Sequence, residues 1–152
     1  MDTATRASAK AHRLVLDTNV WLDLLLFADP RCERLRRALD SGAAVALVDS
    51  HCRDEWLRVL GYPLLRLTKQ RADALQAAFD GIAVRLDTPV RARPWPALPR
   101  CRDPDDQKFL ELACAADAGL LLSRDAALLS LAGRCRRSGL FRIDRPESFE
   151  TS

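Results

Sequence analysis

Acidic residues stand at, or a few residues beyond, the C-terminal ends of four strand-like runs in this chain. They are Asp17, Glu55, the cluster of Asp103, Asp105 and Asp106, and Asp125. In an open parallel α/β sheet the C-terminal ends of the strands share one edge, and ligand sites form in the crevice outside that edge. Acids that are far apart in the sequence would then converge, and clustered carboxylates are stable only with protons or cations among them. The sequence therefore predicts a divalent-metal site.

Each acid also has a purely structural interpretation. Asp17 and Asp125 both precede a predicted helix, where a carboxylate accepts hydrogen bonds from the first backbone N–H groups. Glu55 lies in the first turns of a helix, where the helix dipole favours an acid in any case. Asp49 and Asp54 compete with Glu55 for a role in the site. The argument for a site comes from four such acids at one predicted edge of the sheet.

The segment at residues 103–106 carries the strongest local cluster, because three acids within four residues exceed what one helix cap requires. Asp103 suits the cap position before Pro104, and Asp106 lies one turn further on, where it can point into the crevice. Carboxylates this close raise one another's pKa unless a cation is present. The alternative is that Lys108 neutralises part of this charge.

Strand-like and helix-like segments alternate along the chain. Strands are predicted at residues 13–16, 44–48, 82–86, 120–122 and 140–143, and helices at 18–27, 31–39, 50–60, 68–81, from 103 onward and at 125–131. This alternation implies a parallel sheet with right-handed crossovers. The sequence predicts one doubly wound α/β domain over residues 13–145, with four to five strands and helices on both faces. Residues 1–12 and 146–152 are expected to be tails, the first of them disordered.

Composition excludes several classes of protein. A chain of 152 residues with 48% apolar residues fits one domain with a sizeable core rather than a disordered chain. No apolar run approaches the ~20 residues of a membrane span, and the N-terminus lacks the apolar segment of a secretory signal. Five cysteines without a C-x-x-C pair indicate reduced thiols in the cytoplasm, and two histidines are too few for a histidine-based metal site.

An arginine-rich segment, residues 88–102, leads into the acidic cluster and contains no acid of its own. Arginine pairs with phosphate through its planar fork, and an aromatic side chain can stack on an unpaired base. The alternative is a proline-rich connection whose tryptophan packs on the core. Residues predicted to bind substrate are Arg91, Arg93, Trp95, Arg100, Arg102 and, beside the fourth acid, Arg124.

Five motifs within residues 13–130 resemble those of PIN domains, in particular the subgroup described as toxin components of toxin–antitoxin systems. They are Leu16–Val20 (LDTNV), Val48–Glu55 (VDSHCRDE), Val59–Pro63 (VLGYP), Asp103–Ala113 (DPDDQKFLELA) and Ser123–Asp125 (SRD). The resemblance implies a PIN-like domain with metal-dependent endoribonuclease activity, which hydrolyses RNA phosphodiester bonds with Mg²⁺ or Mn²⁺. It also implies a homodimer and an antitoxin protein as an inhibitory partner.

The resemblance assigns roles by position in these motifs. The catalytic acids would be Asp17, Glu55, Asp106 and Asp125; the metal ligands would be Asp17, Asp106 and Asp125, with Asp103 as a supporting or alternative ligand; Asn19 and Ser123 would support the acids. Asp106 is preferred as the third acid because it precedes Ala113 by seven residues. Many members carry a further acid two residues after the fourth one, where this chain has Ala127. One metal ion is therefore predicted, and a second is left open.

Other classes fit less well. A haloacid-dehalogenase-type phosphatase needs a second acid two residues after the first, and that residue is Asn19 here. A phospho-receiver domain would use a strand-end acid such as Asp49, but it needs an acid pair near the first strand and a lysine after a later one. A non-catalytic PIN-like module that binds RNA or a protein remains the main alternative.

Overall fold

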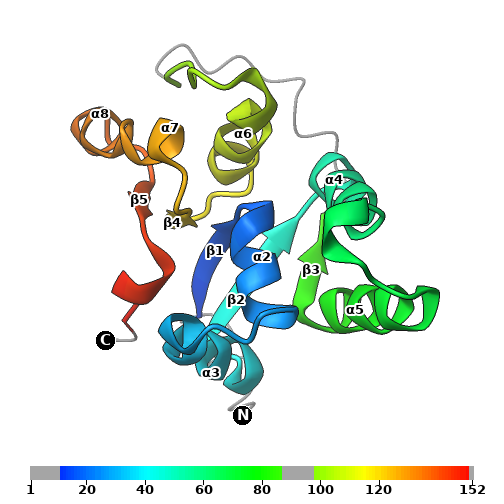
Figure 1. Cartoon of the computed structure of the whole chain (residues 1–152). Helices are drawn as coiled ribbons and strands as arrows, with labels where there is room; N and C mark the ends of the chain where they lie inside the picture. Colours follow the sequence, from blue (N-terminus) through cyan, green and yellow to red (C-terminus); the bar gives the residue numbers. More distant parts are fainter. Residues whose placement is uncertain (1–10, 87–97, 151–152) are drawn as a thin grey trace.

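A parallel sheet of five strands organises the protein (Figure 1), which was studied as a computed structural model that describes residues 11–86 and 98–150. The strand order is β3-β2-β1-β4-β5, and every neighbouring pair is parallel. The strands are β1 His12–Leu16, β2 Ala44–Val48, β3 Ala83–Arg85, β4 Leu120–Leu122 and β5 Arg142–Asp144. The predicted α/β fold class with a parallel sheet is confirmed.

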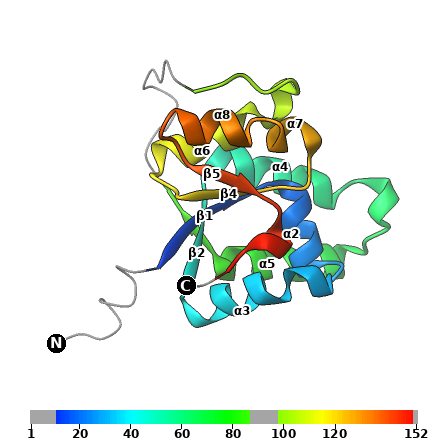
Figure 2. The ribbon, with the colours of Figure 1, turned by 90° about the vertical axis from the view of Figure 1, so that its left-hand side faces the viewer.

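Helices flank the sheet, and Figure 2 shows α6, α7 and α8 above the strands with α3 and α5 below them. The α-helices are α2 Thr18–Leu25, α3 Glu33–Ser41, α4 Ser50–Leu60, α5 Lys69–Ile82, α6 Gln107–Ala115, α7 Ala126–Leu129 and α8 Ala132–Arg137. Short 3₁₀ turns occur at Pro30–Cys32, Pro63–Leu65, Pro104–Asp106 and Pro146–Ser148. Within residues 11–86 and 98–150, no helix combines the length and apolarity that a membrane crossing requires.

The central strands β1 and β4 are apolar because both faces of a parallel sheet are covered by helices. Leu14 and Val15 in β1 and Leu121 in β4 are completely buried. Leu16 pairs with Leu122 at the end of the two strands, and the backbone N–H of Asp17 donates to the Leu122 carbonyl at 3.1 Å. The two strands therefore end at the same level, and the residues that follow them emerge side by side.

Side-chain caps begin the helices that follow the strands. Asp17 accepts a hydrogen bond from the N–H of Val20 at 3.0 Å, and Asp49 accepts one from the N–H of Cys52 at 2.9 Å. Such caps satisfy backbone donors that have no partner within the helix. Helix α4 therefore begins at Ser50, and its cap is Asp49.

Element boundaries differ from the prediction at several points. The first helix ends at Leu25 rather than at residue 27, and α5 continues through Gly81 to Ile82. Helix α8 was not predicted. Beyond residue 145 the chain still belongs to the fold, because Phe149 is buried and its ring lies edge-on to that of His12 at 5.7 Å between centroids.

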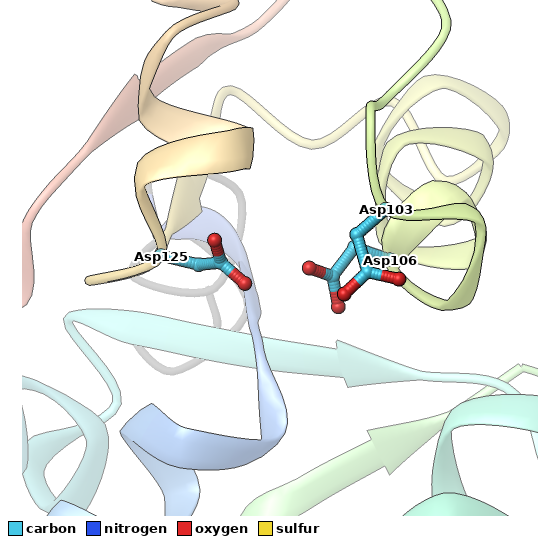
Figure 3. A group of neighbouring side chains, drawn as sticks. All are labelled: Asp103, Asp106 and Asp125. Atoms are coloured by element: carbon cyan, nitrogen blue, oxygen red, sulfur yellow. The ribbon is translucent and has the colours of Figure 1, made fainter.

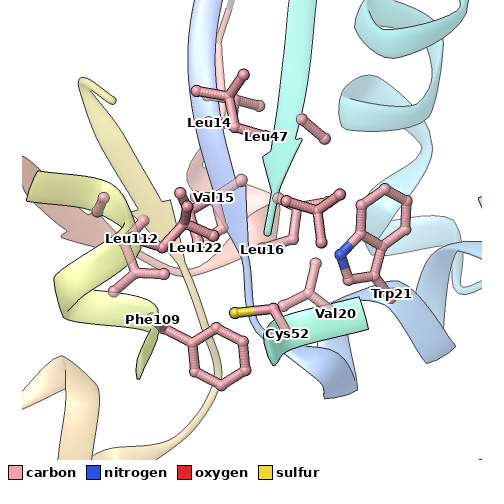
Figure 4. Close-up of a cluster of buried hydrophobic side chains, with 14 of the residues drawn as sticks. Leu14, Val15, Leu16, Val20, Trp21, Leu47, Cys52, Phe109, Leu112 and Leu122 are labelled. Atoms are coloured by element: carbon pink, nitrogen blue, oxygen red, sulfur yellow. The ribbon is translucent and has the colours of Figure 1, made fainter. Parts of the chain in front are cut away.

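The core between helices α2, α4 and α5 is aromatic. Phe79 of α5 lies 5.1 Å from Trp56 of α4 in a stacked arrangement and 4.4 Å from Trp21 of α2, measured between ring centroids. Figure 4 shows the β1 side chains between Trp21 and the α6 side chains Phe109 and Leu112. Buried rings of this size hold α2, α4 and α5 together beneath the C-terminal edge of the sheet.

We expect Phe79→Ala to lower the free energy of unfolding by about 3–5 kcal/mol, because it removes a buried ring and leaves a cavity between two tryptophans. Urea unfolding followed by tryptophan fluorescence measures this loss. The matched control is Leu64→Ala, whose side chain is 93% exposed and which should change stability by no more than about 0.5 kcal/mol. Equal losses in the two variants would contradict this account of the core.

Candidate metal centre

Three aspartates come together from two separate segments. Carboxylate oxygens of Asp103, Asp106 and Asp125 all lie within 4.8 Å of one another. Figure 3 shows Asp103 and Asp106, from the turn before α6, pointing toward Asp125 at the start of α7. The structure thus brings together residues that the sequence placed at two different strand ends.

The aspartate cluster, defined as Asp103, Asp106 and Asp125, holds more negative charge than it can stabilise alone. Burial, together with the hydrogen bond and the charge of Asp125, raises the pKa of Asp106 to about 7. The hydrogen bond from Asp106 lowers the pKa of Asp125, and the Ala127 N–H, which donates to Oδ1 at 2.8 Å, adds to this effect. Without a cation, Asp106 therefore holds its proton to a higher pH than an ordinary aspartate does.

One oxygen of this cluster has no partner. Oδ2 of Asp106 is buried and accepts no hydrogen bond within the described residues. Leaving a buried acceptor unsatisfied costs about 1–3 kcal/mol. The neighbouring polar atoms of the cluster are carboxylate oxygens, which are the ligands that Mg²⁺ and Mn²⁺ prefer. The residues present therefore fit a divalent cation that replaces the proton and takes up the free oxygen.

Asp17 lies beside the cluster but is not one of its members. Its side chain is buried, with Oδ1 on the Val20 N–H and Oδ2 accepting from the Ser123 hydroxyl. The pKa of Asp17 is raised to about 6, because burial and, to a smaller extent, the charges of Asp125 and Glu55 outweigh these hydrogen bonds, which lower it. Asp17 is thus both a helix cap and a carboxylate, next to the candidate centre, whose charged form is disfavoured by burial.

Ser123 joins two of the acids. Its buried hydroxyl donates to Asp17 Oδ2 and accepts from the Asp125 N–H at 2.9 Å. This fixes Asp125 relative to Asp17 across the ends of β1 and β4. Asn19, the other expected supporting residue, lies exposed in the first turn of α2.

Glu55 is held differently from the aspartates. Its Oε1 lies 2.6 Å from the ammonium nitrogen of Lys108, and its Oε2 accepts a hydrogen bond from the Thr18 hydroxyl. Lys108 is buried and also donates to the backbone carbonyl of Asp105. The alternative in which Lys108 neutralises the carboxylates of residues 103–106 is therefore not what the structure shows, because its ion pair is with Glu55.

The residues expected to bind substrate have different surroundings. Arg124 pairs with Asp23 at 2.9 Å and with Glu147 at 2.5 Å. Although burial opposes the charge, these hydrogen bonds raise the pKa of Arg124, so it acts as a structural cation here. Arg100 and Arg102 are exposed, and the charge of Arg102 contributes to the lowered pKa of Asp125. The other three expected residues, Arg91, Arg93 and Trp95, lie outside the described residues.

Two positioning residues were not singled out from the sequence. Thr18, which bonds Glu55, follows Asp17 directly, and the only sequence signal was its place within the LDTNV motif. Gln107 accepts from the N–H of Cys101 at 2.7 Å and donates to the carbonyl of Pro99 at 3.1 Å. These two bonds fix the chain that enters the candidate centre.

The raised pKa values of Asp17 and Asp106 predict that the metal-free protein becomes less stable as the pH rises. Asp17 and Asp106, with pKa values near 6 and 7 against 3.8 in the unfolded chain, bind protons more tightly when folded. Their contribution to stability is therefore present at low pH and is lost between about pH 4 and pH 7. The loss is at most about 1.4 kcal/mol per pKa unit, and solvent screening reduces it for the partly exposed Asp106.

Thermal unfolding in EDTA at pH 5 and pH 7.5 measures this effect. The fall in melting temperature should be smaller in Asp106→Asn, which cannot ionise, and Mn²⁺ should raise the melting temperature of the unchanged protein at pH 7.5. An Asp106→Asn variant with the same pH dependence as the unchanged protein would show that this carboxyl is not the cause.

Comparison with known proteins gives one family. A family model described as PIN domain matches residues 13–127, which is more than half of the chain and includes the aspartate cluster, Asp17 and Glu55. No curated protein matches. PIN domains are typically metal-dependent nucleases, and the acids that the fold gathers at the C-terminal edge of its sheet suit that chemistry. This chain belongs to the PIN domain family.

Proposed function

We propose that this protein is a metal-dependent endoribonuclease that hydrolyses RNA phosphodiester bonds at the aspartate cluster. The observation that carries the proposal is Asp106, whose raised pKa and unpartnered buried Oδ2 mark a place prepared for a cation beside Asp125 and Asp103. The family match supports nuclease chemistry in general. The choice of RNA is supported by the motifs that this chain shares with the toxin subgroup.

The side chains have distinct roles in this proposal. Asp106 and Asp125 would hold Mg²⁺ or Mn²⁺. Asp103, from the same turn as Asp106, would be a further ligand, and the nearby Asp17 would add negative charge. A divalent ion held by these carboxylates would supply Lewis-acid chemistry, which makes a water more acidic and favours the charge of a phosphodiester under attack. Ser123 keeps Asp17 and Asp125 aligned through its two hydrogen bonds. No nucleophilic cysteine or histidine is needed.

The substrate would approach through a polar pocket beside the cluster. The pocket has a volume of about 630 Å³ and shares its wall with the turn that carries Asp105 and with Glu55. Tyr62 at its rim is 49% exposed and offers a face on which an unpaired base can stack. Its lining residues are His51, Glu55, Arg58, Tyr62, Pro104, Asp105, Gln107, Lys108 and Glu111. A polar pocket of this size suits single-stranded RNA, and Arg102 lies close enough to the cluster for its charge to lower the pKa of Asp125.

A role as the toxin of a toxin–antitoxin pair is the finer part of the proposal. It is supported by the five motifs within one small domain and by exposed apolar side chains that a partner could cover. Leu64 is 93% exposed and lies two residues from Tyr62. The proposed cytoplasmic setting includes an antitoxin protein as inhibitor and a homodimer as the working unit.

Cleavage of single-stranded RNA tests this function. The unchanged protein should cut a mixed-sequence RNA with Mn²⁺ or Mg²⁺ and should stop in EDTA. Asp106→Asn and Asp125→Asn should each lose at least about 100-fold in rate, because even outer partners of metal ligands typically contribute 10–100-fold. Asp73→Asn is the matched control, since Asp73 is exposed and pairs with Lys69 in an i,i+4 ion pair.

Cleavage that persists in Asp106→Asn or in EDTA would contradict the proposal. If the folded protein binds the RNA but never cuts it under any metal condition, the non-catalytic PIN-like module becomes the better description.

A further inference from the structure

One acid of the candidate centre already has its own cation. The Lys108 side chain is 7% exposed and the Glu55 side chain 18%, and their charged atoms are 2.6 Å apart. The ammonium group is further fixed by the Asp105 carbonyl and lies 5.0 Å from the centre of the Phe109 ring. A lysine held at three points in this way is a built part of the site and not a mobile surface charge.

The opposite side of Glu55 is also occupied. Its second oxygen accepts from the Thr18 hydroxyl at the start of α2, so both carboxylate oxygens have a partner. Asp106 shows the contrasting case, because one of its oxygens is buried without any partner within the described residues. A divalent ion would satisfy Asp106, whereas at Glu55 it would have to displace a paired ammonium.

Within the described residues, helix α7 adds no further carboxylate beside Asp125. Two residues after Asp125 stands Ala127, which is buried and offers no oxygen from its side chain. A second divalent ion would therefore depend on Glu55, and Glu55 is the acid that Lys108 neutralises.

We infer that Lys108 takes the place of a second divalent ion at Glu55. The protein then binds one divalent ion, on the aspartate cluster, and Glu55 is a positioning residue that anchors Lys108. Lys108 lines the polar pocket as well as pairing with Glu55, so its fixed positive charge faces the side from which a phosphate would approach. The inference rests on the proposed metal site. It adds that this site binds one ion and that Lys108 supplies the positive charge that a second ion would bring.

Counting bound Mn²⁺ tests the inference without using activity. Calorimetry, with electron paramagnetic resonance of free Mn²⁺ as a second count, should give one ion per unchanged chain. Glu55→Gln should still bind one ion with an affinity within about threefold of the original, because Glu55 is not a ligand, whereas Asp106→Asn should lose at least about tenfold. The Glu55→Gln result stands even if a lysine variant does not fold.

A lysine variant tests the exchange of one cation for another. Lys108→Met leaves Glu55 without its partner, so a second Mn²⁺ should bind, and the double variant Lys108→Met with Glu55→Gln should return to one. Lys69→Met is the matched control, because Lys69 is 90% exposed and pairs with Asp73 on the surface of α5.

Three results would overturn the inference alone: two ions on the unchanged protein, a loss of more than about tenfold in Glu55→Gln, or a single ion still on Lys108→Met. No bound ion on the unchanged protein would overturn the proposed metal site itself, and the inference with it.

Discussion

The alignment of β1 and β4 is the constraint on which the rest of the site depends. Because Leu16 pairs with Leu122 in parallel register, both strands end at the same level of the sheet. Asp17 and Ser123 follow at once, and the Ser123 hydroxyl then sets the position of Asp125. A shift of one residue in this register would turn the side chains of the strand to the other face and would separate these groups.

Crowded carboxylates follow from that alignment, and the protein compensates them in two ways. Glu55 receives a fixed ammonium from Lys108, which the fold delivers from the first turn of α6. Among the described residues, Asp106 and Asp125 have no such ion pair, and their contact raises the pKa of Asp106 and lowers that of Asp125. A metal ion can therefore replace a proton at Asp106 and Asp125, whereas Glu55 is already paired with Lys108.

Much of the fold could be predicted from the sequence, because apolar runs and capping acids are local signals. The run that ends at Leu122 predicted a strand, and the three acids at 103–106 predicted a concentration of charge. The pairing of Lys108 with Glu55 could not be predicted, since it depends on how α4 and α6 pack across 52 intervening sequence positions. The structural role of Arg124 was missed for the same reason, because Glu147 reaches it from a segment that was taken for a tail.

Which oxygen atoms surround the ion is the central question, and diffraction from crystals grown with Mn²⁺ answers it most directly. The anomalous signal of manganese locates the ion independently of any assumption about activity. We predict a single peak per chain, between Asp106 and Asp125 and in reach of Asp103, with Lys108 still paired to Glu55. A peak on Glu55, or well-diffracting crystals that show no peak near Asp106, would contradict the account.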